Sequence, residues 1–163
     1  MKLFQRKHLP TTLICLVLAI GALFLAQLPN DTQSDWFRSL IRPEILPRSL
    51  EKKIGLIWTT IFVLAGLGTA SALASTQDTK WKKLQVGLIL GALILNLSYT
   101  FTFTYRRDLW LSTLIAATLA LVLLFLLVST ARRREQLSTL CHLPHFGWVC
   151  FATYVTAKMA SLN

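Results

Sequence analysis

The sequence predicts an all-α membrane protein, a bundle of five transmembrane helices with a short helix in the first loop. Of its 163 residues, 54% are hydrophobic and 15% are charged, whereas roughly a quarter of an ordinary soluble domain is charged. The charges are clustered, so that five apolar stretches carry none, each of roughly the 20 residues that a helix needs to cross a bilayer. Because these stretches are continuous and Leu-rich, they predict helices and not the alternating strands of a barrel.

The five predicted spans cover residues 11–28, 54–75, 84–105, 109–131 and 137–157. The first is expected to be a retained helix, because its apolar part exceeds the roughly 7–15 residues of a signal peptide and no small-residue cleavage site follows it. The spans and their loops account for nearly the whole chain, so residues 1–163 are predicted to form a single domain.

The formal net charge of +10 comes from Lys and Arg residues that flank the predicted spans. Membrane topology explains this charge better than a nucleic-acid partner, and no nucleic acid is expected. The N-terminus and the second and fourth loops carry nine Lys and Arg residues, and the opposite face carries eight. A cytoplasmic N-terminus is favoured because the cations at 80–83 and 132–134 flank short loops. The N-terminus lacks a Ser- and Arg-rich transit segment, which favours a bacterial cytoplasmic membrane over an organelle membrane.

The first loop contains the predicted short helix. In the stretch SDWFRSL, Ser34 or Asp35 is a candidate N-cap, and Pro43 lies downstream as a stop. Trp36 and Phe37 are expected to dip towards lipid from a helix that lies at the membrane surface. The loop either covers one mouth of the bundle or is a plain connector anchored by interfacial aromatic residues.

The third span carries two patterns. Gly87 and Gly91 form a GxxxG motif, which allows another helix to approach closely. That helix belongs either to a second copy, giving a homodimer, or to the same chain. Further along, Asn96 shares one helical face with Tyr99 and Phe103. A side-chain amide in lipid needs a partner, so Asn96 is expected to point into the bundle, as a helix-to-helix hydrogen bond or as a polar contact for a ligand.

The second and fifth spans carry aromatic stripes. Trp58 and Phe62 begin a stripe of aromatic and small residues on one face of the second span. In the fifth span, His145, Trp148 and Ala152 share a face, and the proline just before His145 is expected to kink the helix. A kink beside flat rings predicts the wall of a cavity.

Signs of catalysis and of metal binding are missing from the sequence. His142 and His145 have a ligand-like spacing, but the spans hold no carboxylate and no third ligand, so hydrogen-bonding histidines and no metal site are expected. The three cysteines are odd in number and predict no disulfide framework. The chain has no P-loop, nucleophile elbow or HExxH motif, and no catalytic residue is predicted.

The fifth span also matches a loose pattern proposed for sterol contact. Val149, Tyr154 and Lys158 satisfy L/V-x-Y-x-K/R with variable spacers. Many helix ends match this pattern by chance, so it is a hypothesis about a sterol-like ligand and nothing more.

Three separated motifs resemble those of the TspO/MBR family, also called translocator protein or tryptophan-rich sensory protein. The stretch WFRSLIRP at 36–43, followed by WTTIF at 58–62, is similar to the family's W-Y/F-x-x-L-x-K-P and W-T/G-x-L-Y patterns. The third span matches G-x-x-x-G-Q-x-x-x-N-x-x-W in part, and the fifth matches P-Y-x-x-W-x-x-F-A-T-x-L-N in part. The positions that depart from the family's Gln, Trp, Tyr and Asn are Ala92, Tyr99, His145 and Thr156.

The resemblance implies five helices around a hydrophobic cavity that the first loop closes on one side. It implies a receptor or carrier in the lipid bilayer that binds tetrapyrroles, such as protoporphyrin IX or haem, or sterol-like lipids. A homodimer is the expected assembly, because of the GxxxG motif, and no cofactor is expected to be required. The residues expected to line the site are Trp58, Phe62, Asn96, Tyr99, Phe103, His145, Trp148 and Ala152. Two alternatives stay open: an enzyme that breaks down porphyrins with light or oxygen, and a structural membrane protein that acts through dimerisation.

Overall fold

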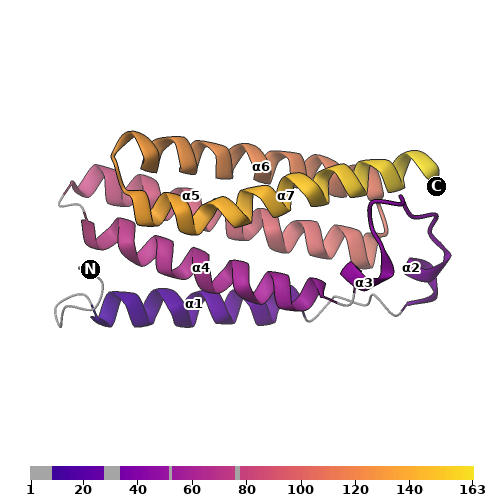
Figure 1. Ribbon diagram of the computed structural model, residues 1–163, viewed down its shortest axis with the longest axis horizontal. Helices are drawn as coiled ribbons and strands as arrows, with labels where there is room; N and C mark the ends of the chain where they lie inside the picture. Colours follow the sequence, from indigo (N-terminus) through magenta and orange to yellow (C-terminus); the bar gives the residue numbers. More distant parts are fainter. Residues whose placement is uncertain (1–8, 28–33, 52, 76–77) are drawn as a thin grey trace.

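The chain folds into five long helices that lie side by side in an elongated bundle (Figure 1). The computed structural model describes residues 9–27, 34–51, 53–75 and 78–163. The long helices are α1 (Leu9–Gln27), α4 (Ile54–Ser75), α5 (Thr79–Phe101), α6 (Leu109–Arg132) and α7 (Gln136–Leu162). The π-helical segment η2 (Thr102–Arg106) extends α5, and α2 (Asp35–Ser39) and α3 (Arg48–Glu51) lie in the first loop. The described parts contain no strand, so the all-α prediction is confirmed.

Three of the long helices are long and apolar enough to cross a membrane: α4, α5 with its π-helical extension, and α6. The apolar stretch Leu9–Leu25 of α1 is shorter. Length and composition therefore identify three spans among the described residues, and the count of five stays a prediction.

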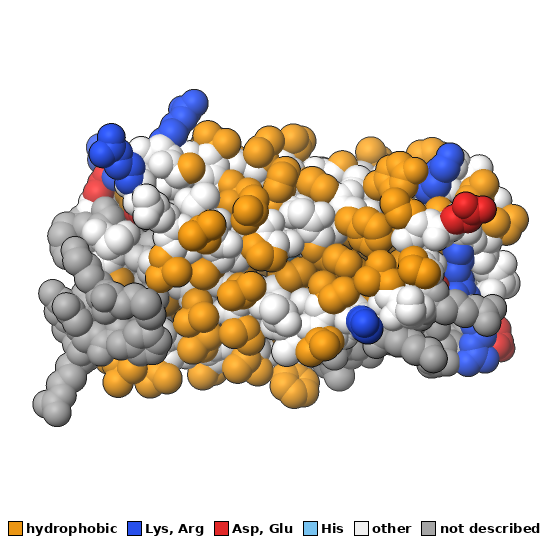
Figure 2. All heavy atoms as spheres, in the orientation of Figure 1, with side chains coloured by type: hydrophobic (Ala, Val, Ile, Leu, Met, Phe, Trp, Pro, Cys, Tyr) orange, Lys and Arg blue, Asp and Glu red, His pale blue; other side chains and the backbone are white. Residues whose placement is uncertain are grey.

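The surface of the bundle is that of a membrane protein. Hydrophobic side chains cover the length of the face in Figure 2, and the charged side chains lie mostly towards its two ends. Large apolar side chains are exposed on every long helix, among them Val17, Leu56, Leu90, Leu121 and Leu140. Such a surface is stable in hydrocarbon and not in water, so this is an integral membrane protein.

Helix α4 lies between α1 and α7, and small residues allow the close approach on both sides. A Cβ atom added at Gly66 would lie 3.0 Å from the Ala19 Cβ on α1. A Cβ atom added at Gly68 would lie 2.9 Å from the Cys141 Cβ on α7. These contacts use the same packing principle as GxxxG motifs, but they involve two glycines that the sequence did not single out.

The first loop folds over one end of the bundle, and we call residues 34–51 the lid. The Ser34 hydroxyl accepts the Phe37 amide hydrogen at 3.2 Å, which confirms the predicted N-cap of α2. Phe37 is 6% exposed and packs with Val155 and Met159 of α7. The prediction that Phe37 dips towards lipid is therefore wrong, because its ring finds a better apolar environment against α7. The lid is more than a connector, since it covers this end of the bundle (Figure 1).

At the opposite end of the bundle, polar contacts join the connection between α4 and α5 to the connection between α6 and α7. Asp78 caps α5 by accepting the Trp81 and Lys80 amide hydrogens, and it pairs with Arg133 at 3.2 Å. These hydrogen bonds, with the one from the Trp81 amide foremost, lower the pKa of the Asp78 carboxyl. The Trp81 indole N–H donates to the Glu135 carboxylate at 2.9 Å. The α4–α5 connection is thus held to the α6–α7 connection.

Candidate ligand-binding site

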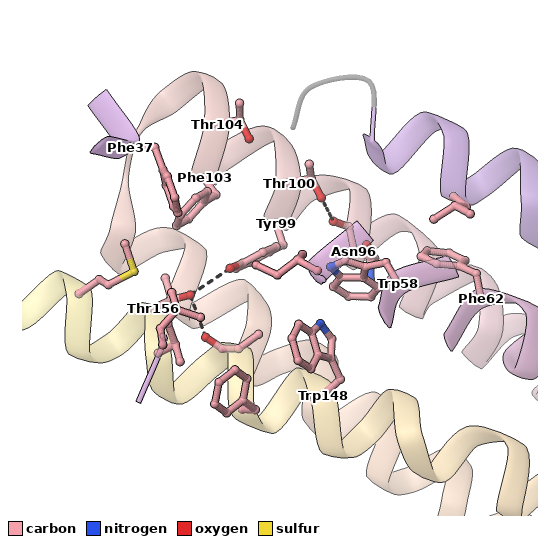
Figure 3. A pocket seen from close by; sticks show the side chains of 17 residues that line it. Phe37, Trp58, Phe62, Asn96, Tyr99, Thr100, Phe103, Thr104, Trp148 and Thr156 are labelled. Atoms are coloured by element: carbon pink, nitrogen blue, oxygen red, sulfur yellow. Dashed lines mark hydrogen bonds between the residues drawn. The ribbon is translucent and has the colours of Figure 1, made fainter. Parts of the chain in front are cut away.

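A cavity of about 110 Å³ lies under the lid, between α4, α5 and α7 (Figure 3). Most of its lining is aromatic or aliphatic. The aromatic residues are Phe37, Trp58, Phe62, Tyr99, Phe103, Trp148 and Phe151, and the polar ones are Asn96, Thr100, Thr104 and Thr156. The described lining contains no Asp and no Glu, and so no pair of carboxylates.

Of the eight residues that the sequence nominated for the site, seven line this cavity: Trp58, Phe62, Asn96, Tyr99, Phe103, Trp148 and Ala152. The eighth, His145, does not. It is 7% exposed and lies behind the wall, with its ring centroid 6.1 Å from that of Trp58 and 6.3 Å from that of Phe62. Helical spacing places His145 on the same face of α7 as Trp148 and Ala152. The larger rings of Trp58 and Phe62 lie between His145 and the cavity. The binding role of these residues stays a prediction.

The aromatic rings form two walls of different geometry. The Trp58 and Trp148 rings meet edge to face, with centroids 6.3 Å apart and planes at 86°. The Tyr99 and Phe103 rings are stacked, with centroids 5.8 Å apart and planes at 21°. Offset-stacked and T-shaped pairs are the favoured arrangements of aromatic side chains. The two tryptophan rings therefore form a corner of the lining, and the Tyr99 and Phe103 rings lie nearly parallel.

Two hydrogen-bond donors in the cavity are unused. Asn96 is 3% exposed, and its side-chain nitrogen has no hydrogen-bond partner within the described chain. The same holds for the Trp148 indole nitrogen, and Figure 3 places Asn96, Trp58 and Trp148 together on one side of the cavity. By contrast, the Tyr99 hydroxyl is paired with that of Thr156 at 2.9 Å. Buried donors without partners are rare and costly, so the site is suited to a ligand that presents an acceptor.

Two cation–π contacts involve aromatic residues of the lid. The Arg107 guanidinium lies 5.7 Å from the Trp36 ring centroid, and that of Arg42 lies 5.0 Å from the Phe37 ring centroid. Arg42 is also paired with Glu51 at 2.7 Å. The Arg107 contact joins the lid to the end of η2, whereas the Arg42 contacts lie within the lid.

The sequence missed the lining residues that come from outside the three predicted stripes, such as Leu23 of α1 and Leu46 of the lid. No periodic signal marks Leu23, because α1 is apolar on all sides. Leu46 has no helical context and lies in the cavity only because the lid folds back. The signal that was available was the N-cap at Ser34, which predicted α2 and with it an ordered lid.

Two further predictions concern surfaces and not the cavity. Val149 is 2% exposed and packs in the core, whereas Tyr154 and Lys158 lie on the outside, so the three residues of the sterol pattern do not form one surface.

Cβ atoms added at Gly87 and Gly91 would meet nothing within 4 Å. The GxxxG motif therefore does not pack against another helix within the described chain, and a homodimer through it stays a prediction.

The comparison with known proteins agrees with this architecture. The sequence model of the TspO/MBR family matches residues 12–162. The chain is 26% identical over 164 residues to "Tryptophan-rich protein TspO" of Chlorobaculum tepidum, covering 98% of this chain and 99% of that protein. It is 30% identical over 148 residues to "Uncharacterized membrane protein YtaB" of Bacillus subtilis, covering 89% and 87%. It is 24% identical over 161 residues to "Tryptophan-rich protein TspO" of Bacillus cereus, covering 99% and 100%.

Proposed function

Because this chain belongs to the TspO/MBR family, whose sequence model it matches over residues 12–162, we propose that it is a five-span membrane receptor or carrier for tetrapyrroles or sterol-like lipids. The ligand binds in the cavity under the lid. Transport of the ligand and signalling of its presence are both compatible with such a site. We place it in a bacterial cytoplasmic membrane, since the relatives named above are bacterial.

The observation that carries the proposal is the pairing of flat aromatic walls with two unused donors. The Trp58 and Trp148 rings stand nearly perpendicular to one another, so a planar ring system would stack on one of them and meet the edge of the other. The Asn96 amide and the Trp148 indole N–H would donate to an acceptor on the ligand. Sites for small molecules are built in this way, from an apolar lining with a few placed polar groups.

Among the ligands that the family resemblance implies, the chemistry of the site favours a tetrapyrrole with carboxylates over a sterol. The Arg107 guanidinium lies against Trp36 of the lid, where it would meet acidic substituents. Arg42 is already paired with Glu51. A sterol carries no charge, so it would offer no ionic partner to the Arg107 guanidinium.

The cavity has to widen for such a ligand. Its volume of about 110 Å³ is below the roughly 300–1,000 Å³ of sites for drug-sized molecules. The lid supplies Phe37 and Leu46 to the lining. Unlike most of the cavity wall, the lid is not part of a long helix. We therefore propose that the lid moves outwards when the ligand enters.

The test is a titration of the purified protein with protoporphyrin IX, read from the ligand's own absorption band so that tryptophan substitutions do not disturb the signal. Saturable binding is expected, and Trp148→Ala should weaken it by at least about tenfold, since truncating a buried aromatic anchor costs 2 kcal/mol or more. The matched control is Trp110→Ala, because Trp110 is 60% exposed on α6 and does not line the cavity. Equal affinities for the two variants would refute the site.

We also propose that two copies associate through α5. Gly87 is exposed and Gly91 half-exposed, and nothing in the described chain fills the space above them. Gly87→Leu should abolish a crosslinked dimer in bilayers. Gly21→Leu is the control, because Gly21 is an equally uncontacted glycine on α1. A dimer that survives Gly87→Leu, or one that Gly21→Leu also removes, would rule out this interface.

A further inference from the structure

Nine buried side-chain polar atoms lack a hydrogen-bond partner within the described residues, and all of them belong to α5, to α7 or to its N-cap. Two of them, on Asn96 and Trp148, are the unused donors of the ligand cavity. The other seven lie outside it, on Gln85, Glu135, Ser138, His142 and His145. The proposed ligand therefore does not account for them.

Helical spacing places four of these residues, Gln85, Glu135, Ser138 and His142, towards the end of the bundle opposite the lid. The hydrogen bond of 2.9 Å between Trp81 and Glu135 joins the start of α5 to the start of α7. Gln85 follows Trp81 by four residues and so lies on the same face, about 6 Å further along α5. Ser138 and His142 follow Glu135 by three and seven residues, which places them on one face of α7, about 4.5 and 10 Å further along.

The site that they form is closed to the surroundings. Gln85 and Ser138 are 0% exposed, and His142 is 2% exposed. On the side of α4, a Cβ atom at Gly68 would lie 3.1 Å from the His142 Nε2 atom, so the α4 backbone covers the imidazole. On the other side of His142, the next turn of α7 carries His145, whose ring is next to Trp58.

The chemistry of the unpaired atoms identifies what fills the site. The Gln85 amide supplies both donors and an acceptor, the Ser138 hydroxyl supplies one of each, and a neutral His142 ring supplies one of each. A cation would need acceptors only, and the described residues form no group that could hold a metal ion. Water both donates and accepts, and internal waters typically bind two to four otherwise unsatisfied polar groups.

We propose that Gln85, Ser138 and His142 form an internal water-binding site between α5 and α7, at the end of the bundle opposite the lid. Glu135 lies at the aqueous end of this site, and its second carboxylate oxygen is one of the unpaired acceptors. His145 lies at the other end, behind the wall of the ligand cavity. The site does not depend on any ligand, so it is testable whether or not the cavity binds tetrapyrroles.

The experiment is water-edited solid-state NMR of the full chain in lipid bilayers, which measures how fast magnetisation passes from water to each side chain. We expect the Gln85 amide and the His142 ring to receive it several times faster than the Leu126 methyl groups. Leu126 is the dry control, because it is 1% exposed and lies about 9 Å from the same end of the bundle. Transfer to Gln85 and His142 as slow as that to Leu126 would overturn the proposal.

A variant separates bound water from direct pairing of the side chains. Gln85→Met keeps the length of the side chain and removes its polar atoms, so transfer to His142 should fall in this variant. If Gln85 instead pairs directly with His142 or Ser138 and no water is present, both signals are slow in the unsubstituted protein. That result overturns the proposal even if Gln85→Met does not fold.

Discussion

The side chain of Asn163 pairs with the backbone of Ile41. Its oxygen accepts the Ile41 amide hydrogen at 2.9 Å, and its nitrogen donates to the Ile41 carbonyl at 3.1 Å. This pair ties the end of α7 to the lid over a separation of 122 residues. It lies at the surface and can open without disturbing the core, so it fits a latch for the lid.

We expect Asn163→Ala to loosen the lid. Two hydrogen bonds to the lid of about 0.5–1 kcal/mol each would be lost, and a third, from the Asn163 nitrogen to the Met159 carbonyl, lies within the end of α7 and does not hold the lid. A loss of 1–2 kcal/mol raises the open population by roughly 5- to 30-fold. Hydrogen exchange of the backbone amides of residues 36–46, followed by mass spectrometry, measures this change. Ser161→Ala is the control, because the Ser161 hydroxyl bonds only to the Lys158 carbonyl of its own helix. Unchanged exchange in Asn163→Ala would show that the latch does not hold the lid.

Substitution by alanine should destabilise the protein at Gly68 of α4 but not at Gly91 of α5. Gly68→Ala brings a Cβ atom to 2.9 Å from the Cys141 Cβ, and we expect it to lower the free energy of unfolding by about 1–3 kcal/mol, the usual cost of overpacking. Gly91→Ala meets nothing within 4 Å and should leave the monomer as stable as before, or slightly more stable. Thermal unfolding in detergent compares the two. Equal melting temperatures would contradict the close approach of α4 and α7.

We expect the stability of the fold to fall at acid pH because of Asp78. Its folded pKa is lowered from the ordinary value of 3.8, so its charged form stabilises the fold at pH values above the unfolded pKa. This contribution is lost as the pH falls through the folded pKa. Asp78→Asn keeps a capping side chain but loses the charge, so its melting temperature should lie below that of the unsubstituted protein at neutral pH and approach it as the pH falls below 3.8. A difference that does not change with pH would contradict the assignment. Arg133→Gln, which removes the paired cation, should reduce the pH dependence in part.

Asn96 should show a conflict between stability and binding. Asn96→Leu replaces a buried amide whose nitrogen is unpaired, so we expect the empty protein to unfold at the same temperature or a higher one. Affinity for a carboxylated ligand should fall by about tenfold, which corresponds to one hydrogen bond of about 1.4 kcal/mol. A variant that is less stable and binds as well would mean that Asn96 has a structural role only.

Much of the fold follows from the sequence because charges and caps mark the ends of helices. The predicted span 54–75 coincides with α4. Helix α5 begins five residues before the predicted span, at Thr79, because Asp78 caps it and the three lysines that were assigned to a loop form its first turns. Helix α7 extends beyond its predicted ends for a similar reason, since polar residues are compatible with helix in the headgroup region.

The sequence predicted which helix faces point into the bundle, but not which residues on those faces reach the cavity. Helical spacing placed Trp58, Asn96 and Trp148 on inward faces, and the structure brings them to one cavity. The same spacing could not show that His145 lies behind other rings, or that Phe37 turns inwards, because both depend on how α4 and the lid pack against α7. Packing between elements that are distant in sequence leaves no periodic signal within either one.

The central claim is that a tetrapyrrole binds under the lid, against Trp148. The most direct measurement is the indole N–H spectrum of the protein in the presence of increasing protoporphyrin IX, because the chain has only five tryptophans and the exposed Trp110 serves as an internal reference. Saturable shifts of the Trp148 and Trp58 signals, with that of Trp110 unmoved, are the predicted result. No saturable shift, or a largest shift at Trp110, would contradict the account.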